Sequence, residues 1–374
     1  GSEMCIRDSV GPGGSGKTRL AVEVARRLAG DFPDGVYLVS LSPLPDPAAI
    51  VPALTQLFRL PAQEKTDPRA QLLDFLREKR LLLIMDSFER LTAGADLVLD
   101  ILRQAAGVKV LVTSRVLLKA KGEHVFHVAG LELPDEGDGS QIEAAAAVRL
   151  FLSAAERAVP GYRPAEEALP DIVKICRLAE GMPLTIILAS AWLQLYSPAA
   201  IARQIDQSLD FLTVEWADLP PRQRSLRATL DYTWQLLDEA QQAALANLSV
   251  FRGGFTAEAA AEVANLSGPA LLGLLDRSVI QRAGGDRFVI HDMLRQYAAE
   301  RLAEQPDAES AARRSHAAYF TSLAAGLVGD LKGAAQQAAL DQLDADSTNL
   351  NAAWGWAAQN RQVEWLDRAL EGVG

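Results

Sequence analysis

The spacing of apolar residues divides the chain into regions of different structure. Up to about Leu133, short unbroken apolar runs alternate with stretches in which apolar residues recur every three or four positions. The runs predict buried strands and the periodic stretches predict amphipathic helices. Buried strands separated by helices are typical of a parallel sheet covered on both faces. We therefore predict an α/β domain over residues 10–134, with strands at 36–41, 81–86, 108–113 and, at an edge, 124–128, and with helices at 17–28, 50–57 and 68–79.

A helical pattern replaces this alternation after the break Pro134–Gly139, which is rich in Pro, Asp and Gly, as linkers often are. Residues 140–215 predict an all-α domain whose helices are interrupted at Gly181-Met182-Pro183. The dipeptide Pro220-Pro221 marks a second boundary.

A candidate hairpin characterises residues 220–305. The runs Val279–Arg282 and Arg287–Ile290 are joined through Gly284-Gly285, and such a pair predicts two antiparallel strands. Three predicted helices precede the hairpin, at 226–248, 257–264 and 269–277, and helices followed by a hairpin predict a winged-helix domain.

The last stretch, residues 310–374, is helical and rich in small residues, with Trp354, Trp356 and Trp365 as candidate packing anchors. It predicts the start of a TPR-like helical-repeat array.

Both ends of the chain depart from these patterns. Residues 1–9 lack a helical or alternating spacing, and Arg7 and Asp8 stand where a buried strand should lead into the next segment. We therefore predict no regular first strand and interpret residues 1–9 as a non-native scar. Because the chain stops at Gly374 inside a helical pattern, we expect it to be a fragment of a longer protein.

Composition restricts the function classes. Lys and Arg number 37 against 48 Asp and Glu, a formal charge of -11, which argues against a broad nucleic-acid surface. We expect DNA contacts only through domains absent from this chain. No apolar run approaches the roughly 20 residues that span a membrane. Cys5 and Cys176 are the only cysteines, which excludes a disulfide framework and favours a cytoplasmic location.

A phosphate-binding loop is the most specific motif, because a G-x-x-x-x-G-K-T sequence opens the predicted helix 17–28. Glycines let backbone N–H groups converge on phosphates, and the helix N-terminus adds partial positive charge. Lys17 is predicted to reach the β- and γ-phosphates and Thr18 to bind Mg²⁺. The predicted nucleotide-binding residues of this loop are Gly11, Gly13, Gly14, Ser15, Gly16, Lys17, Thr18 and Arg19.

Three further residues lie where predicted strands end, and ligands gather at that edge of open α/β sheets. Asp86 is predicted to hold Mg²⁺, partly through water, although it could simply cap the next turn. Glu89 either orients the attacking water or is a solvated acid at a helix start. Arg115 either reaches the γ-phosphate or is a surface arginine paired with a carboxylate. Lys17, Asp86, Glu89 and Arg115 form the predicted catalytic set.

Taken together, the ordered motifs resemble the NB-ARC branch of the STAND signalling ATPases, and among these the bacterial regulators of the AfsR and LuxR type. The resemblance covers about residues 10–374. Its motifs are the phosphate loop, Leu82-Leu83-Ile84-Met85-Asp86, Thr113-Ser114-Arg115, Gly181-Met182-Pro183-Leu184 and Ile290-His291-Asp292.

The resemblance implies an ATP/ADP switch with Mg²⁺ and slow hydrolysis. Pro183 would pack near the adenine and ribose, and His291 would contact the β-phosphate of ADP. ADP would hold the domains closed, whereas ATP would favour an open form that self-associates. An inducer would act on the C-terminal helical array. The choice of ATP over GTP also rests on the resemblance.

Two other function classes fit parts of the pattern. One is an AAA-like remodelling ATPase with continuous turnover. The other is a winged-helix DNA-binding regulator with an accessory ATPase, which the weakly charged segment 269–277 disfavours. His124 and His127 are three residues apart on a predicted strand, so they face opposite sides and cannot chelate one metal.

Overall fold

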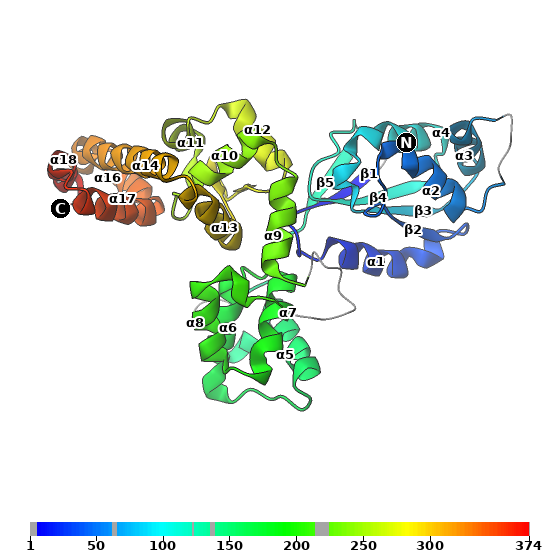
Figure 1. Cartoon of the computed structure of the whole chain (residues 1–374), viewed down its shortest axis with the longest axis horizontal. Helices are drawn as coiled ribbons and strands as arrows, with labels where there is room; N and C mark the ends of the chain where they lie inside the picture. The colour runs from blue at the N-terminus through cyan, green and yellow to red at the C-terminus, as the bar shows by residue number, and fades with distance from the viewer. Residues whose placement is uncertain (1–5, 62–65, 122, 135–138, 214–223, 374) are drawn as a thin grey trace. The chain divides into compact units, whose positions relative to one another are not determined.

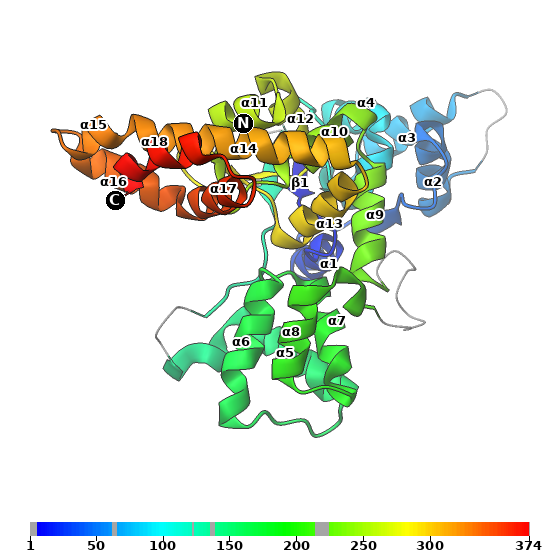
Figure 2. The same ribbon diagram turned by 60° about the vertical axis from the view of Figure 1, so that its left-hand side comes forward.

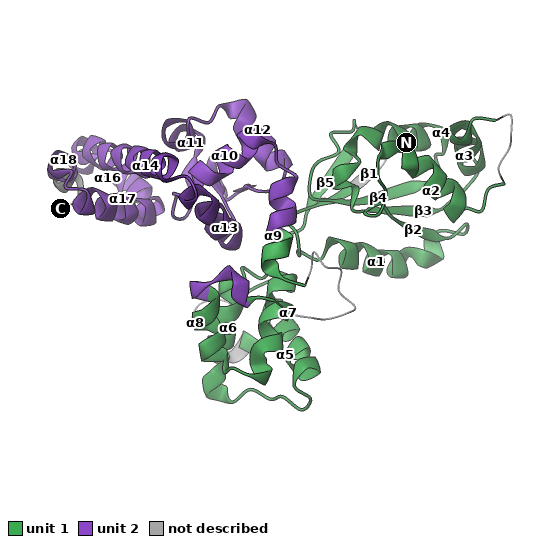
Figure 3. Cartoon of the chain, viewed as in Figure 1, with its two compact units in different colours: residues 1–205, 212–229 green, residues 206–211, 230–374 purple. Residues whose placement is uncertain are grey.

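The computed structural model describes residues 6–61, 66–121, 123–134, 139–213 and 224–373. The chain forms two compact units (Figure 3). None of the helices described is both long enough and apolar enough to cross a membrane. Unit 1 consists of Gly1–Ile205 and Leu212–Thr229, and unit 2 of Asp206–Phe211 and Leu230–Gly374.

Unit 1 contains a five-stranded sheet in the order β2-β3-β4-β1-β5, in which every neighbouring pair is parallel. The predicted α/β fold is thereby confirmed, including β5 as an edge strand. The ends of β2, β3, β4 and β5 differ from the predicted ends by at most one residue. The strands are β1 (Ile6–Val10), β2 (Val36–Ser40), β3 (Leu82–Asp86), β4 (Lys109–Ser114) and β5 (Glu123–His127).

Strand β1 corrects the prediction that residues 1–9 contain no strand. Ile6 pairs with Val110 on one side and with Glu123 on the other, so β1 is an interior strand. Backbone groups bonded on both sides hold the strand whatever its side-chain pattern. The side-chain prediction failed because Asp8 is fully buried at a position that normally holds an apolar residue. That residues 1–9 are non-native stays a prediction.

Helices cover both faces of the sheet (Figure 1). On one face, Ala21 and Ala25 of α1 pack against Leu82 and Ile84 of β3. The other face carries the main core, to which α2, α3 and α4 contribute. Helix α4 was not predicted, although its Leu97, Val98, Ile101 and Leu102 are buried with helical spacing. The bounds are α1 (Lys17–Leu28), α2 (Ile50–Leu57), α3 (Pro68–Leu76) and α4 (Ala95–Gln104).

The rest of unit 1 is helical, as predicted, with a break before Pro183. Gly181 has a φ of 68°, and a Cβ there would lie 2.2 Å from the Leu131 carbonyl oxygen. Glycine is therefore required both for its conformation and for the close approach of the two backbones. The helices are α5 (Ala146–Ala158), α6 (Leu169–Leu178), α7 (Pro183–Ala191) and α8 (Pro198–Gln207).

The larger segment of unit 2, Leu230–Gly374, begins within helix α9. It contains a small antiparallel sheet in the order β6-β8-β7. The predicted hairpin is confirmed as β7 and β8, whereas β6 was missed. The single helix predicted over 226–248 is wrong, because Asp238 and Gln241 form a capping box that starts a second helix. The elements are α9 (Leu226–Gln235), α10 (Glu239–Leu248), β6 (Phe255–Thr256), α11 (Ala257–Ala264), α12 (Gly268–Asp276), β7 (Gln281–Arg282), β8 (Arg287–Val289) and α13 (Asp292–Ala303).

The C-terminal helices of unit 2 pack around α14, which contacts both α17 and α18 (Figure 2). The rings of Trp356 and Trp365 stack with centroids 6.3 Å apart, so these two predicted anchors do pack together. The helices are α14 (Pro306–Gly326), α15 (Val328–Leu331), α16 (Gln336–Ala345), α17 (Ser347–Gln359) and α18 (Val363–Val373).

Candidate functional site

The phosphate loop connects the end of β1 to the start of α1. Gly14 and Gly16 adopt φ angles of 86° and 89°, which disfavour any residue with a Cβ. Gly16 is the N-cap of α1 and makes no side-chain cap bond. The first-turn amides of α1 therefore have no intrahelical partner and are available to an anion.

Close packing explains why the loop has no side chains at these positions. A Cβ on Gly13 would lie 2.5 Å from Nη1 of Arg115 and 2.7 Å from Cγ2 of Thr229. A Cβ on Gly14 would lie 2.8 Å from the Cβ of Leu184, whose N–H donates to the Gly14 carbonyl at 3.2 Å. The loop is thus packed between the sheet edge and the start of α7, and its exposed backbone groups remain for a ligand.

Pro183, the first residue of α7, lies on the same side of the loop. Its Cγ would be 3.7 Å from a Cβ on Gly16, an ordinary contact distance. The helical part of unit 1 therefore brings Pro183 to the phosphate loop. The predicted contact of Pro183 with adenine and ribose stays a prediction.

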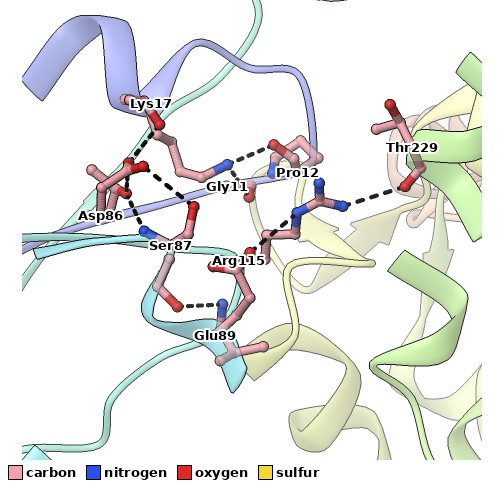
Figure 4. Close-up of polar contacts among 12 residues, drawn as sticks. Gly11, Pro12, Lys17, Asp86, Ser87, Glu89, Arg115 and Thr229 are labelled. Atoms are coloured by element: carbon pink, nitrogen blue, oxygen red, sulfur yellow. Dashed lines mark hydrogen bonds and ion pairs between the residues drawn. The ribbon is translucent and has the colours of Figure 1, made fainter. Parts of the chain in front are cut away.

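Lys17 folds back over the loop (Figure 4). Its Nζ donates to the carbonyl oxygens of Gly11 at 2.9 Å and Pro12 at 2.8 Å. Burial lowers the pKa of Lys17 to about 7, and the positive charge of Arg115 acts in the same direction. A phosphate beside the Lys17 ammonium would add negative charge and so raise this pKa again.

Asp86 accepts three hydroxyl hydrogen bonds at the C-terminal end of β3, one of them from Ser87 Oγ to its Oδ2 at 3.4 Å. Its Oδ1 accepts from Thr18 Oγ1 at 2.5 Å and from Thr113 Oγ1 at 2.6 Å. Carboxylate and hydroxyl oxygens are ligands that Mg²⁺ accepts, so this pair fits a metal site beside the phosphates. Sequence reasoning missed Thr113 as a site residue. Its position near the end of β4, in register with Asp86 of the neighbouring strand β3, is the feature that could have identified it.

Glu89 and Arg115 lie together and are buried, with side chains only 4% and 8% exposed. Arg115 Nε is 3.8 Å from Glu89 Oε1, and Nη1 donates to the Thr229 carbonyl at 3.3 Å (Figure 4). The interpretation of Glu89 as a solvated acid is wrong. Arg115 is paired with a carboxylate, as one alternative held, but it is not a surface residue. The pair is an interior link between the sheet edge and helix α9.

A third carboxylate beneath the loop was not expected. Asp8 is fully buried, and burial, reinforced by the Glu123 carboxyl, raises its pKa to about 9. Asp8 is therefore protonated at neutral pH. A neutral acid in this place contributes no charge to bind phosphate or metal.

The other predicted residues are placed as follows. Arg19 is exposed on the first turn of α1. His291 is the N-cap of α13 in unit 2, and its Nδ1 accepts from the Met293 N–H at 3.3 Å. Its contact with ADP stays a prediction. His124 and His127 are exposed on β5. Among the described residues no group of three or more His, Cys, Asp or Glu side chains could hold a metal ion.

Comparison with known proteins fits this geometry. Residues 9–118 match the family model described as AAA domain. The chain carries a P-loop ATPase domain of the AAA class. Binding of a nucleotide, usually together with Mg²⁺, follows from that domain type. The glycines, Lys17, Thr18 and Asp86 of the AAA domain have the chemistry and space that both ligands require.

Two of the proteins that this chain resembles are named as regulators. A protein of Mycobacterium tuberculosis, provisionally named an HTH-type transcriptional regulator, is 30% identical over 364 residues, which covers 94% of this chain and 40% of that protein. The regulatory protein AfsR of Streptomyces griseus is 28% identical over 349 residues, covering 87% of this chain and 33% of AfsR. The chain thus spans well under half the length of these relatives.

Two solved structures that resemble this chain are more distant in sequence. The STAND protein PH0952 from Pyrococcus horikoshii, which has a tetratricopeptide-repeat sensor, is 15% identical with a TM-score of 0.30, covering 98% of this chain and 55% of that one. The Aeropyrum pernix ORC2 protein is 14% identical with a TM-score of 0.47, covering 82% and 88%.

Proposed function

We propose that this chain is the nucleotide-controlled switch of a larger signalling regulator. It binds ATP or ADP with Mg²⁺ through the AAA domain and hydrolyses ATP slowly. The observation that carries the proposal is the position of Arg115, whose guanidinium lies against Gly13 of the phosphate loop while Nη1 bonds the Thr229 carbonyl. One side chain therefore has contacts both with the loop and with the helix that continues into unit 2.

Charge explains how a third phosphate would act on this link. The γ-phosphate adds negative charge beside the loop, and an arginine forms stronger hydrogen bonds with phosphate than with a backbone carbonyl. Arg115 would then exchange its Thr229 contact for the phosphate, which frees helix α9. ADP lacks this group and leaves the contact in place. Differential contacts of this kind shift a population between two conformations.

Hydrolysis would use the same residues. Lys17 would stabilise negative charge on the phosphates, and Thr18 and Asp86 would hold Mg²⁺, which would supply further positive charge there. Glu89 orients the attacking water once Arg115 has turned away from it. Because Glu89 is buried and paired with Arg115, its release is a condition for catalysis. This condition supports slow turnover. Slow turnover suits a switch whose conformation depends on whether ATP or ADP is bound.

The remaining assignments extend the proposal to the rest of the chain. The segments are assigned as a helical domain at 140–215 that contributes Pro183, a winged helix at 220–305 that contributes His291 to the β-phosphate of ADP, and a helical-repeat array from 310 onwards that receives an inducer. The ATP form self-associates in the cytoplasm. DNA is contacted through parts of the regulator that this chain does not contain. Helices α10, α11 and α12, followed by the hairpin β7–β8, support the winged helix. The greater length of the relatives supports DNA contacts outside this chain.

Nucleotide retention tests the proposal. The purified protein should carry ADP, identified by chromatography after denaturation, and Lys17→Ala should lose it. Lys79→Ala is the matched control, because Lys79 is a half-exposed lysine of the same domain that pairs with Asp34. Equal ADP content in Lys17→Ala and wild type would contradict the role of the loop. ATP turnover of many cycles per second would contradict the switch and favour a remodelling ATPase.

A further inference from the structure

Thr113 joins the Asp86 carboxylate to the Ser87 backbone through one hydroxyl. It ends β4, is 1% exposed, and pairs in register with Asp86 of the neighbouring strand. Its Oγ1 donates to Asp86 Oδ1 at 2.6 Å and accepts from the Ser87 N–H at 3.0 Å. A single hydroxyl therefore touches the carboxylate and the residue that follows it.

Hydrogen-bond direction leaves this hydroxyl one orientation. The Ser87 backbone N–H can only donate, so Thr113 Oγ1 accepts from it and its own proton points to Asp86. Ser87 has a φ of 65°, a conformation that residues with a Cβ rarely adopt. The bond from its N–H helps to hold this turn, after which the chain reaches Glu89.

Thr18 shares the same carboxylate oxygen but has a different role. Its hydroxyl donates to Asp86 Oδ1 at 2.5 Å, and the proposed function assigns that hydroxyl to Mg²⁺. When Thr18 turns to a metal, Oδ1 of Asp86 loses one of its two hydroxyl partners, while the Ser87 hydroxyl stays on Oδ2 at 3.4 Å. Thr113 then remains as the hydroxyl donor to Oδ1, because its second contact is with the Ser87 N–H and not with the metal.

We propose that Thr113 is a positioning residue for the magnesium carboxylate. It fixes the orientation of Asp86 and the turn at Ser87, so that the carboxylate faces the metal without reorganising. Residues that orient metal ligands through hydrogen bonds commonly change metal affinity about 10- to 100-fold. This inference rests on the proposed function, since it needs a nucleotide with Mg²⁺ in the AAA domain.

The test measures binding of a fluorescent ADP derivative by anisotropy, first in EDTA and then with increasing Mg²⁺. For Thr113→Val we expect the half-saturating Mg²⁺ concentration to rise about 10- to 100-fold, with the affinity in EDTA unchanged within about twofold. Thr113→Ser keeps the hydroxyl and should restore the wild-type Mg²⁺ response. Thr321→Val is the matched control, because Thr321 is a buried threonine of unit 2 whose hydroxyl bonds the Ala317 carbonyl.

Distinct results overturn the two proposals. If wild type and Thr113→Val respond equally to Mg²⁺, Thr113 does not position the carboxylate. If Thr113→Val loses affinity equally in EDTA and in Mg²⁺, its role is structural and the inference fails. If wild type binds no ADP in either condition, the proposed function fails first. Should Thr113→Val not fold, Thr113→Ala, which leaves space for a water, takes its place.

Discussion

Two buried polar clusters, one in each unit, use different chemistry. The first, which we call the loop cluster, consists of Lys17, Asp86, Glu89, Arg115 and the two threonines on Asp86. All four named side chains are ionisable, and their contacts are shared among backbone carbonyls, hydroxyls and one ion pair. The second, the asparagine cluster of unit 2, is centred on a neutral amide. It contains Arg252, Arg287, His316, Asp346 and Asn349.

Asn349 uses all its hydrogen-bonding capacity inside the protein. Its amide donates to the Gly254 carbonyl at 2.8 Å and to Asp346 Oδ1 at 3.4 Å. Its oxygen accepts from the Arg252 N–H at 2.6 Å and lies 3.3 Å from His316 Nε2. An amide offers two donors and two acceptor lone pairs, so nothing is left for a ligand. The cluster fastens the segment before β6 to helices α14 and α17.

The partners of the buried cations complete the contrast between the clusters. In the asparagine cluster Arg287 pairs with Asp346 at 2.7 Å, and burial lowers the pKa of His316 to about 4, so its imidazole is uncharged at neutral pH. A fully bonded network of this kind stabilises one structure. In the loop cluster Lys17 bonds the carbonyl oxygens of Gly11 and Pro12, and a phosphate would supply it with a direct counter-charge. A buried cation bonded to neutral groups, rather than buried polarity as such, therefore indicates the ligand site.

Breaking the asparagine cluster should have the largest effect. Asn349→Leu keeps the approximate volume but leaves the Arg252 N–H and the Gly254 carbonyl short of a partner. We expect unfolding of unit 2 to become easier by roughly 2–4 kcal/mol, since each buried group costs about 1–3 kcal/mol. Urea denaturation followed by tryptophan fluorescence measures this. Asn351→Leu, at an exposed position of the same helix, is the control. A loss of nucleotide affinity with unchanged stability would reverse the assignment of the two clusters.

Asp8 sharpens the comparison, because it is a buried acid that belongs to neither cluster. Its folded pKa of about 9 lies above the unfolded value of 3.8, so the native state keeps a proton that the unfolded chain releases. Stability is therefore highest below about pH 4 for this group and declines towards pH 9, by at most about 1.4 kcal/mol per pH unit. Asp8→Asn should remove this decline in thermal melts between pH 5 and 8. An unchanged slope would place the pH dependence elsewhere.

Proton uptake on nucleotide binding is the smallest expected effect. Burial lowers the pKa of Lys17 to about 7, and a bound phosphate would raise it again. At pH 8, ADP binding should therefore take up less than one proton per ADP. Phosphate itself is fully ionised there, since its second pKa is about 6. Calorimetry in two buffers of different ionisation enthalpy gives the number. We expect little uptake at pH 6, where Lys17 is already protonated. Equal enthalpies in both buffers at pH 8 would contradict the lowered pKa.

The sequence by itself determined the parts of the AAA domain that depend on local pattern. Helix α1 begins and ends where its apolar spacing predicts, and β3 ends at Asp86 as predicted. The glycine-rich loop predicted a phosphate-binding site. Gly14 and Gly16 adopt φ angles that residues with a Cβ rarely adopt, so the glycines of the motif are required there. These features depend on neighbours within a few positions, which any sequence displays.

Tertiary structure alone decided the features that depend on distant segments. Strand β1 forms because β4 and β5 bond its backbone on both sides, despite Asp8. Glu89 and Arg115 are 26 positions apart and become buried partners only when β3 and β4 lie side by side. Thr113 reaches Asp86 through the same register, and Asn349 meets Arg252 across 97 positions. Burial and pairing at such separations are set by packing of the whole unit. The local pattern therefore named Glu89 and Arg115 without their partnership, and it did not reveal the contacts of Thr113 and Asn349.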